Sequence, residues 1–266
     1  MKIPKLLNPK KYLKWIQRKY YLKIYDVDRM RKIEVDKFNK IGFKLDDSLK
    51  KLDQILLAMN KSHFTMNKGM ASIHWVLFTS ISIVSSVKDI LEIGTYDGET
   101  TSVLSGIFPD SKITTVDLPD DDPIYKKTYH RADSDIRKNL KNTRDTNLNN
   151  PNISLLLKNS FFLPEFTQEK YDLIWIDGGH LYPEVAWDIC NAFHLCKTGG
   201  WILCDDVIPL RRGHRDEMVS PDSYEVLNYI EARTGYEVNY FLKREDPIWS
   251  ADPRKRKYVA VMRKML

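Results

Sequence analysis

Three aspartates stand where apolar runs of the sequence end, and their placement points to chemistry. The stretch "WIDGGHLYPEVAWD" (175–188) leaves an apolar run at Asp177, and "GGWILCDDV" (199–207) leaves another at Asp205 and Asp206. If these runs are neighbouring parallel strands, the carboxylates meet at one sheet edge. Clustered carboxylates repel one another unless a cation joins them, and Mg²⁺, Mn²⁺ or Ca²⁺ favours such oxygen ligands. We therefore expect a divalent metal, Mg²⁺ first, at Asp177, Asp205 and Asp206, the alternative being acids that only face solvent.

A histidine follows the first of these acids by three residues. His180 is expected at the start of a helix that runs through Val185, Ile189 and Phe193. An imidazole can take a proton from a hydroxyl near neutral pH, so His180 is a candidate general base; equally, it could orient Asp177 by a hydrogen bond. His180 and Asp177 are thus the candidate catalytic residues. His214, in a loop with Arg211, Arg212 and Arg215, is a weaker second candidate.

A second group of residues lies in "LEIGTYDGETT" (91–101), after an apolar run and before a predicted helix. Gly94 and Gly98 let backbone approach a ligand closely. A dinucleotide fingerprint needs a further glycine where Tyr96 stands, which argues against a nicotinamide cofactor. Glu92 would attract an ammonium group and repel a phosphate, and Asp117 lies where an acid accepts hydrogen bonds from ribose hydroxyls. This combination suits a nucleoside that carries an amino acid, namely S-adenosylmethionine.

Strands and helices alternate through most of the chain. Apolar runs that read as strands cover 89–94, 112–118, 152–160, 171–179 and 199–207, and a helix is expected near 221–234. Two further strand candidates, 236–243 and 257–264, have no helix between them and would pair antiparallel at one sheet edge. The pattern predicts an α/β fold with a doubly wound, mostly parallel, seven-stranded sheet. The long connection 119–151 either caps a substrate or is a solvated crossover.

The motifs resemble a known family. "ILEIGTYDGETT", "TTVDL", "LLKNS", "YDLIWIDGGHLYPEVAWDI" and "KTGGWILCDDV" are similar to the successive motifs of class I S-adenosylmethionine-dependent methyltransferases, and to the metal-dependent subgroup that includes sugar O-methyltransferases. The resemblance covers about residues 70–208. It implies a Rossmann-like methyltransferase fold and a divalent ion that chelates substrate hydroxyls. The cofactor-binding residues that it implies, with Tyr96 departing from the usual small or polar residue, are Glu92, Gly94, Tyr96, Gly98, Asp117, Asn159, Ser160 and Asp177.

The function expected from these motifs is O-methylation of a hydroxyl on a sugar, a nucleotide-linked sugar or a similar small metabolite, with S-adenosylmethionine as cofactor. Two alternatives stay open. One is a methyltransferase without a metal, in which His180 alone activates the acceptor. The other is a non-catalytic nucleotide-binding partner protein, although acids at all three positions count against it.

Charge is distributed unevenly along the chain. Eight of the 42 basic residues, and no acid, lie in residues 1–25, which leaves 34 basic against 36 acidic residues in a nearly neutral remainder. A nucleic-acid-binding core is therefore not expected. Residues 1–68 form a basic, helical N-terminal extension, and residues 69–266 form the methyltransferase domain. The first helix either lies on an anionic membrane surface or packs on the domain or a second subunit of a homo-oligomer.

The cysteines bear on the compartment. Cys190, Cys196 and Cys204 are odd in number and sit in apolar settings, which indicates buried thiols in a reducing compartment, the cytoplasm. No apolar run is long enough to span a membrane, and a secretory signal is excluded by the prolines and lysines of the first residues.

Overall fold

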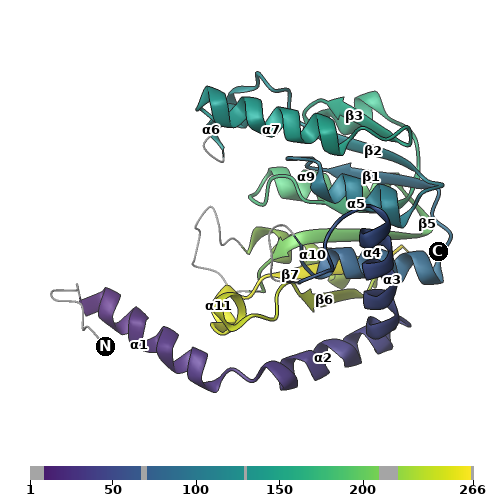
Figure 1. The fold of residues 1–266 in the computed structure, drawn as a ribbon. Helices are drawn as coiled ribbons and strands as arrows, with labels where there is room; N and C mark the ends of the chain where they lie inside the picture. The colour runs from purple at the N-terminus through teal and green to yellow at the C-terminus, as the bar shows by residue number, and fades with distance from the viewer. Residues whose placement is uncertain (1–8, 67–70, 129–130, 210–220, 265–266) are drawn as a thin grey trace.

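A seven-stranded sheet with helices on both faces forms the body of the computed structural model, which describes residues 9–66, 71–128, 131–209 and 221–264 (Figure 1). The strand order is β3-β2-β1-β4-β5-β7-β6. The strands are β1 (Asp89–Ile93), β2 (Lys112–Asp117), β3 (Ile153–Leu157), β4 (Tyr171–Ile176), β5 (Cys196–Val207), β6 (Val238–Leu242) and β7 (Tyr258–Arg263). The predicted α/β fold is confirmed.

The direction of the strands decides where their ends meet. β1 to β5 run parallel, whereas β7 pairs antiparallel with both β5 and β6. The predicted antiparallel pair is therefore present at one edge, with β7 placed between β5 and β6. The carboxyl end of β6 and the amino end of β7 lie at the same edge of the sheet as the carboxyl ends of β4 and β5. The connection between β6 and β7 therefore lies at that edge too. That edge holds the residues singled out in the sequence.

Alternate residues of the strands pack on opposite sides of the sheet. On β4, Leu173 and Trp175 belong to one buried cluster, while Ile174 and Ile176 belong to the other. The first cluster is covered by α2 (Val27–Lys40), α3 (Leu45–Ala58), α4 (Ile73–Val84) and α5 (Glu99–Ile107), and the second by α9 (Glu184–Leu195) and α10 (Asp222–Thr234). Both sheet faces are thus dry, as a parallel sheet requires.

Two helices that precede the sheet along the chain contribute to its core. Phe38 of α2 and Leu52 of α3 are fully buried in the same cluster as Trp201 and Phe241 of the sheet. On α4, every residue from 73 to 81 is buried. Residues 27–58 therefore stabilise one face of the sheet rather than standing apart from it.

Shorter elements fill the connections. The segment between β2 and β3 forms α6 (Pro123–Lys127) and α7 (Ser134–Asn147), and the β3–β4 connection forms η1 (Ser160–Phe162) and α8 (Leu163–Phe166). The β6–β7 connection forms α11 (Pro247–Ser250) and η2 (Pro253–Lys255). Asp122 and Asp133 each accept two backbone N–H groups at the starts of α6 and α7, which explains why those helices begin there.

The first helix, α1 (Pro9–Ile24), extends away from the sheet (Figure 1). None of the helices in the described part of the chain is long and apolar enough to cross a membrane. The three cysteines are free, and Cys196 and Cys204 are buried as predicted. Cys190 is exposed, so the prediction was wrong there: it lies on the outer side of α9, away from the sheet.

Candidate active site

The glycine loop between β1 and α5 has the backbone that the motif predicts. Gly94 and Gly98 adopt positive φ values of 99° and 75°, a conformation that L side chains rarely adopt. A Cβ on Gly94 would lie 2.3 Å from the carbonyl oxygen of Asp177. Glycine is needed at 94 because the ends of β1 and β4 touch there, and not only because a ligand must approach.

Tyr96, the departure from the family pattern, also lies in the left-handed region, at φ 52°. Its backbone N–H donates to Asp117 Oδ2 at 2.9 Å, and Leu118 N–H donates to Oδ1 at 2.7 Å. Burial raises the pKa of Asp117, against the lowering effect of these two hydrogen bonds. The acid predicted to meet ribose is thus fixed in place by the loop that carries the glycines.

Glu92 lies beneath this loop and is completely buried. Its Oε2 accepts hydrogen bonds from the hydroxyls of Thr101 and Thr115, while Oε1 has no partner among the described residues. Burial raises the pKa of Glu92 to about 7. A buried, unpartnered carboxylate oxygen fits the ammonium group of an amino acid, directly or through water, and this supports the predicted role.

The long connection after β2 packs on the glycine loop. Arg131, which is buried, stacks its guanidinium 5.2 Å from the ring of Tyr96 and 4.0 Å from the ring of Tyr125. Arg144 is 1% exposed and binds Asp120 through two hydrogen bonds of 2.7 and 3.0 Å. The described parts of segment 119–151 therefore pack beside Asp117, which is more than a solvated crossover provides.

The two predicted adenine contacts after β3, Asn159 and Ser160, make hydrogen bonds to nearby residues. Asn159 Oδ1 accepts a hydrogen bond from the N–H of Phe161 at 2.9 Å, and the hydroxyl of Ser160 donates a hydrogen bond to the buried carboxylate of Asp188. Burial raises the pKa of Asp188 to about 6. A cavity of about 420 Å³ adjoins them, lined by residues that include Pro119, Asn159 and Phe162. The cavity gives these predicted adenine contacts an apolar wall at the carboxyl ends of β2 and β3.

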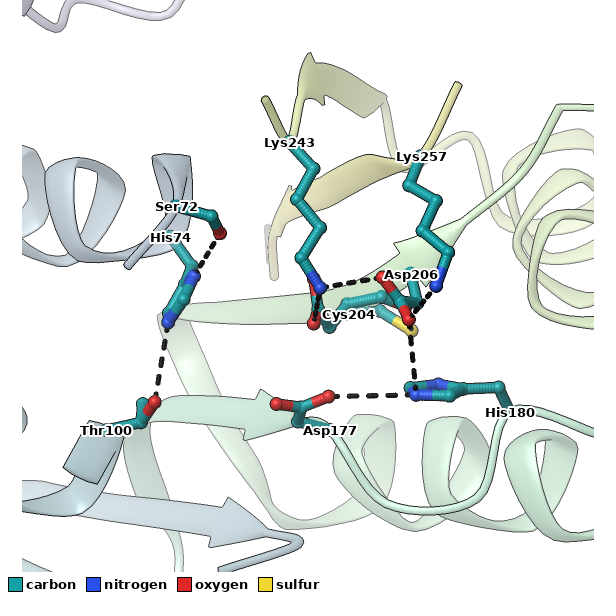
Figure 2. A network of polar contacts seen from close by, with 10 residues as sticks. Ser72, His74, Thr100, Asp177, His180, Cys204, Asp206, Lys243 and Lys257 are labelled. Atoms are coloured by element: carbon teal, nitrogen blue, oxygen red, sulfur yellow. Dashed lines mark hydrogen bonds and ion pairs between the residues drawn. The ribbon is translucent and has the colours of Figure 1, made fainter. Parts of the chain in front are cut away.

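The three predicted aspartates lie at the ends of β4 and β5, and Figure 2 shows Asp177 and Asp206 on either side of His180. Burial raises the pKa of Asp177 well above its ordinary value, and the charge and hydrogen bond of Asp205 act in the same direction. Asp205 Oδ1 is buried, and no donor to it is found among the described residues. Asp206 has a positive φ of 53°, a left-handed conformation that residues other than glycine rarely adopt, and its carboxylate contacts Lys243, Lys257 and His180.

Two lysines that the motif reading missed reach this cluster from the β6–β7 connection (Figure 2). Lys243 Nζ lies 2.5 Å from Asp205 Oδ2 and 2.6 Å from Asp206 Oδ1, and Lys257 Nζ lies 2.5 Å from Asp206 Oδ2. Burial disfavours the charged form of Asp206, but Lys243, His180 and Lys257 outweigh it and hold the pKa of Asp206 well below its usual range. The acids and lysines form an ion-pair cluster.

This arrangement does not fit the predicted divalent ion. No group of three or more His, Cys, Asp or Glu residues within the described ranges is placed to hold a metal. The oxygens that would bind one instead accept the ammonium groups of Lys243 and Lys257. Lys243 and Lys257 bring two positive charges to the acids and offset the repulsion among them without a metal. The cation that the sequence requires is supplied by side chains.

His180 precedes α9 by four residues instead of starting it, and it lies between two of the acids. Its Nε2 is 3.7 Å from both Asp177 Oδ1 and Asp206 Oδ2, and its side chain is 22% exposed. Burial lowers the pKa of His180, with help from the lysine charges and against the effect of Asp206 and Asp205. The imidazole is therefore neutral at neutral pH and accessible, which are the requirements of a base.

A second histidine stands behind the acids. His74, on α4, stacks on Trp175 with ring centroids 5.1 Å apart, and its Nδ1 lies 2.5 Å from the hydroxyl of Ser72. Burial lowers the pKa of His74 to about 3. It is a neutral core residue that supports β4. The weaker candidates His214, Arg211, Arg212 and Arg215 lie outside the described residues.

Comparison with known proteins identifies a methyltransferase domain in the chain and solved structures of the same fold. Residues 91–207 match a family model described as a methyltransferase domain. No curated protein matches the chain. Among solved structures, the O-methyltransferase TomG of Streptomyces achromogenes, in complex with S-adenosylmethionine, has 14% identity and a TM-score of 0.52, over 91% of this chain and 100% of that one.

Two further structures show the same likeness. A candidate O-methyltransferase of Klebsiella pneumoniae has 14% identity and a TM-score of 0.54, with coverage of 88% of this chain and 96% of its own. The O-methyltransferase of Bacillus cereus, in complex with S-adenosylhomocysteine, has 16% identity and a TM-score of 0.50, with coverage of 90% and 100%. The protein thus has the class I methyltransferase fold, and the matched segment carries the glycine loop and all three aspartates.

Proposed function

We propose that this protein is an S-adenosylmethionine-dependent O-methyltransferase that acts on a hydroxyl of a small polar metabolite, such as a sugar or a nucleotide-linked sugar. The observation that carries the proposal is the position of His180, a neutral and accessible imidazole beside Asp177, at the same sheet edge as the glycine loop and Asp117. The methyltransferase family match and the solved O-methyltransferases of the same fold support the reaction class.

The residues for the cofactor divide along the edge of the sheet. Glu92, with its unpartnered Oε1, faces the methionine end, Asp117 faces ribose, and Asn159 with the adjoining cavity faces adenine. S-adenosylmethionine supplies a methyl group on a sulfonium centre, and alkylation of a hydroxyl releases one proton. A residue that accepts this proton is therefore required near the acceptor oxygen.

His180 accepts that proton at Nε2. Its lowered pKa keeps it neutral before the reaction, and Asp206, whose carboxylate lies 3.7 Å away and has a pKa held low, stabilises the imidazolium that results. Lys243 and Lys257 add positive charge beside the oxygen as its proton leaves. The base and its electrostatic support thus come from β4, β5 and the β6–β7 connection, without a step through a metal.

The metal-dependent form of the reaction remains the alternative. A divalent ion at Asp177, Asp205 and Asp206 would have to displace the ammonium groups that now bind two of these acids. The ion-pair cluster favours the version in which His180 acts as the base without a metal. Sensitivity to a chelator distinguishes the two.

Calorimetric titration with S-adenosylhomocysteine, with and without a chelator, tests the proposal. We expect binding in both conditions, and we expect Asp117→Asn to weaken it. Activity is then followed as S-adenosylhomocysteine release over a panel of sugars and nucleotide-linked sugars in the presence of chelator. Absence of any binding to the cofactor product would refute the reaction class, and binding with turnover only after Mg²⁺ is added would establish the metal-dependent form.

A further inference from the structure

A row of apolar side chains on α1 is exposed to solvent in a helix that carries no acidic residue. Leu13, Ile16, Tyr20 and Ile24 follow one another at helical spacing and are between 42% and 59% exposed. We call these four residues the α1 stripe. Side chains of this size are normally covered, and a contiguous exposed row marks an interaction surface. The question is which partner covers it.

The contacts of α1 with the body leave the stripe free. Arg254 of η2 donates to Gln17 at 3.4 Å and stacks 5.6 Å from the ring of Tyr21. Just beyond the helix, the Tyr25 hydroxyl donates to the carbonyl of Glu245 at 2.9 Å. These contacts hold the C-terminal half of α1 beside the β6–β7 connection, as Figure 1 shows. None of them uses a residue of the α1 stripe.

The charge around the stripe selects the partner. Lys14, Arg18, Lys19 and Lys23 lie between the stripe residues along the described helix, and the first turn has no acid. Two stripes from two copies of the chain would bring these basic residues together, and like charges repel. A nucleic acid would neutralise the charge but leave the stripe exposed. A bilayer of anionic lipids satisfies both, because it accepts apolar side chains and attracts lysine and arginine.

A second exposed apolar group lies on the connection that contacts α1. Ile248 and Trp249 of α11 are 64% and 58% exposed, and Arg244 stacks 5.7 Å from the Trp249 ring. A tryptophan beside an arginine is typical of the interface between water and lipid headgroups. α11 belongs to the connection between Lys243 and Lys257, so the segment that carries Ile248 and Trp249 also carries two residues of the ion-pair cluster.

We propose that α1, assisted by α11, binds the protein to the surface of an anionic membrane. The α1 stripe enters the boundary between headgroups and acyl chains, and the flanking lysines and arginine stay among the phosphates. This proposal does not depend on the methyltransferase reaction, since it rests on the exposed side chains of α1 and α11 and on the charge of α1.

Vesicle sedimentation of the full chain tests it. We expect binding to vesicles of phosphatidylcholine mixed with phosphatidylglycerol, weak binding to phosphatidylcholine alone, and loss of binding as salt is raised. Lys14→Gln with Arg18→Gln should weaken binding about 25-fold, because each basic residue near an anionic surface contributes about five-fold. Leu13→Gln with Ile16→Gln should also release the protein, and glutamine preserves helix propensity.

A matched control comes from α7, where Ile136 and Lys138 are exposed far from α1. Ile136→Gln with Lys138→Gln should bind vesicles as the wild type does, and circular dichroism should show equal helix content in all variants. Wild-type protein that ignores anionic vesicles at low salt overturns the proposal. So does a stripe variant that keeps its vesicle affinity but converts an oligomer to a monomer in sedimentation velocity, which would assign the stripe to a second copy.

Discussion

Replacement of Lys243 by methionine is the sharpest test of the ion-pair cluster. The side chain of Lys243 is 15% exposed and binds Asp205, which is 2% exposed, together with Asp206. Removing one partner of a buried ion pair leaves uncompensated charge and costs about 3–5 kcal/mol. Lys243→Met should therefore lower the free energy of unfolding by about 3–5 kcal/mol at neutral pH, measured by urea denaturation. The loss should shrink at acidic pH, where protonation relieves the unpaired acids.

Lys257→Met is the matched comparison, because this lysine is 31% exposed and makes one ion pair with Asp206. Its loss should cost about 1 kcal/mol. In the double variant the acids are free to bind a cation, so Mg²⁺ at 100 times its Kd should restore about 2.7 kcal/mol, while it leaves the wild type unchanged. Equal costs for the two single variants, or a wild type that magnesium stabilises as much as the double variant, would show that the lysines do not take the place of a metal.

Three more outcomes follow from the site. His180→Gln should lower turnover by about 10²- to 10⁴-fold while S-adenosylhomocysteine affinity by calorimetry stays constant, and a change in affinity alone would remove the base role. Gly94→Ala should lower the free energy of unfolding, measured in urea, by about 3 kcal/mol or more, because the new Cβ would lie 2.3 Å from the carbonyl oxygen of Asp177. Gly235→Ala, which has open space around it, should lower it by about 1 kcal/mol, and similar losses for the two variants would refute the close approach of Gly94 to Asp177. Burial raises the pKa of Glu92 to about 7 from an ordinary 4.5, so the protonated side chain contributes about 3 kcal/mol to the stability of the folded state below pH 4.5, and this contribution is lost as the pH rises to 7. Glu92→Gln should therefore flatten the pH dependence of the free energy of unfolding, and an unchanged pH profile would contradict this reasoning.

The strands and the acids could be predicted because both depend on local patterns. Apolar runs of the length of Tyr171–Ile176, broken by Asp177, read as buried strands, and the edge at which parallel strands end follows from the fold class. The convergence of Asp177, Asp205 and Asp206 therefore needed only the alternation of strands and helices along the chain.

The lysines could not be placed by the same reasoning. Their proximity to the acids depends on β7 lying between β5 and β6, a pairing between segments about 50 residues apart that no local pattern encodes. A signal was nevertheless present, because the predicted strands 236–243 and 257–264 end and begin with Lys243 and Lys257. In an antiparallel pair these positions share one edge, so a hairpin beside β5 delivers two ammonium groups to the acids.

The reason for Gly94 also lay beyond the sequence. The motif suggested close approach to a ligand, while the structure shows contact with the backbone of Asp177. The exposed Cys190 was missed for a related reason, since an apolar neighbourhood in sequence does not show which side of α9 a residue occupies.

The position of both lysines on one hairpin has an evolutionary consequence. The acids belong to β4 and β5, so exchange of two codons at positions 243 and 257 would open their oxygens to a metal while the rest of the domain is retained. A lineage built on this scaffold could thus pass between ion-free and ion-requiring enzymes in two mutational steps, with the order of those steps set by how much instability each intermediate tolerates.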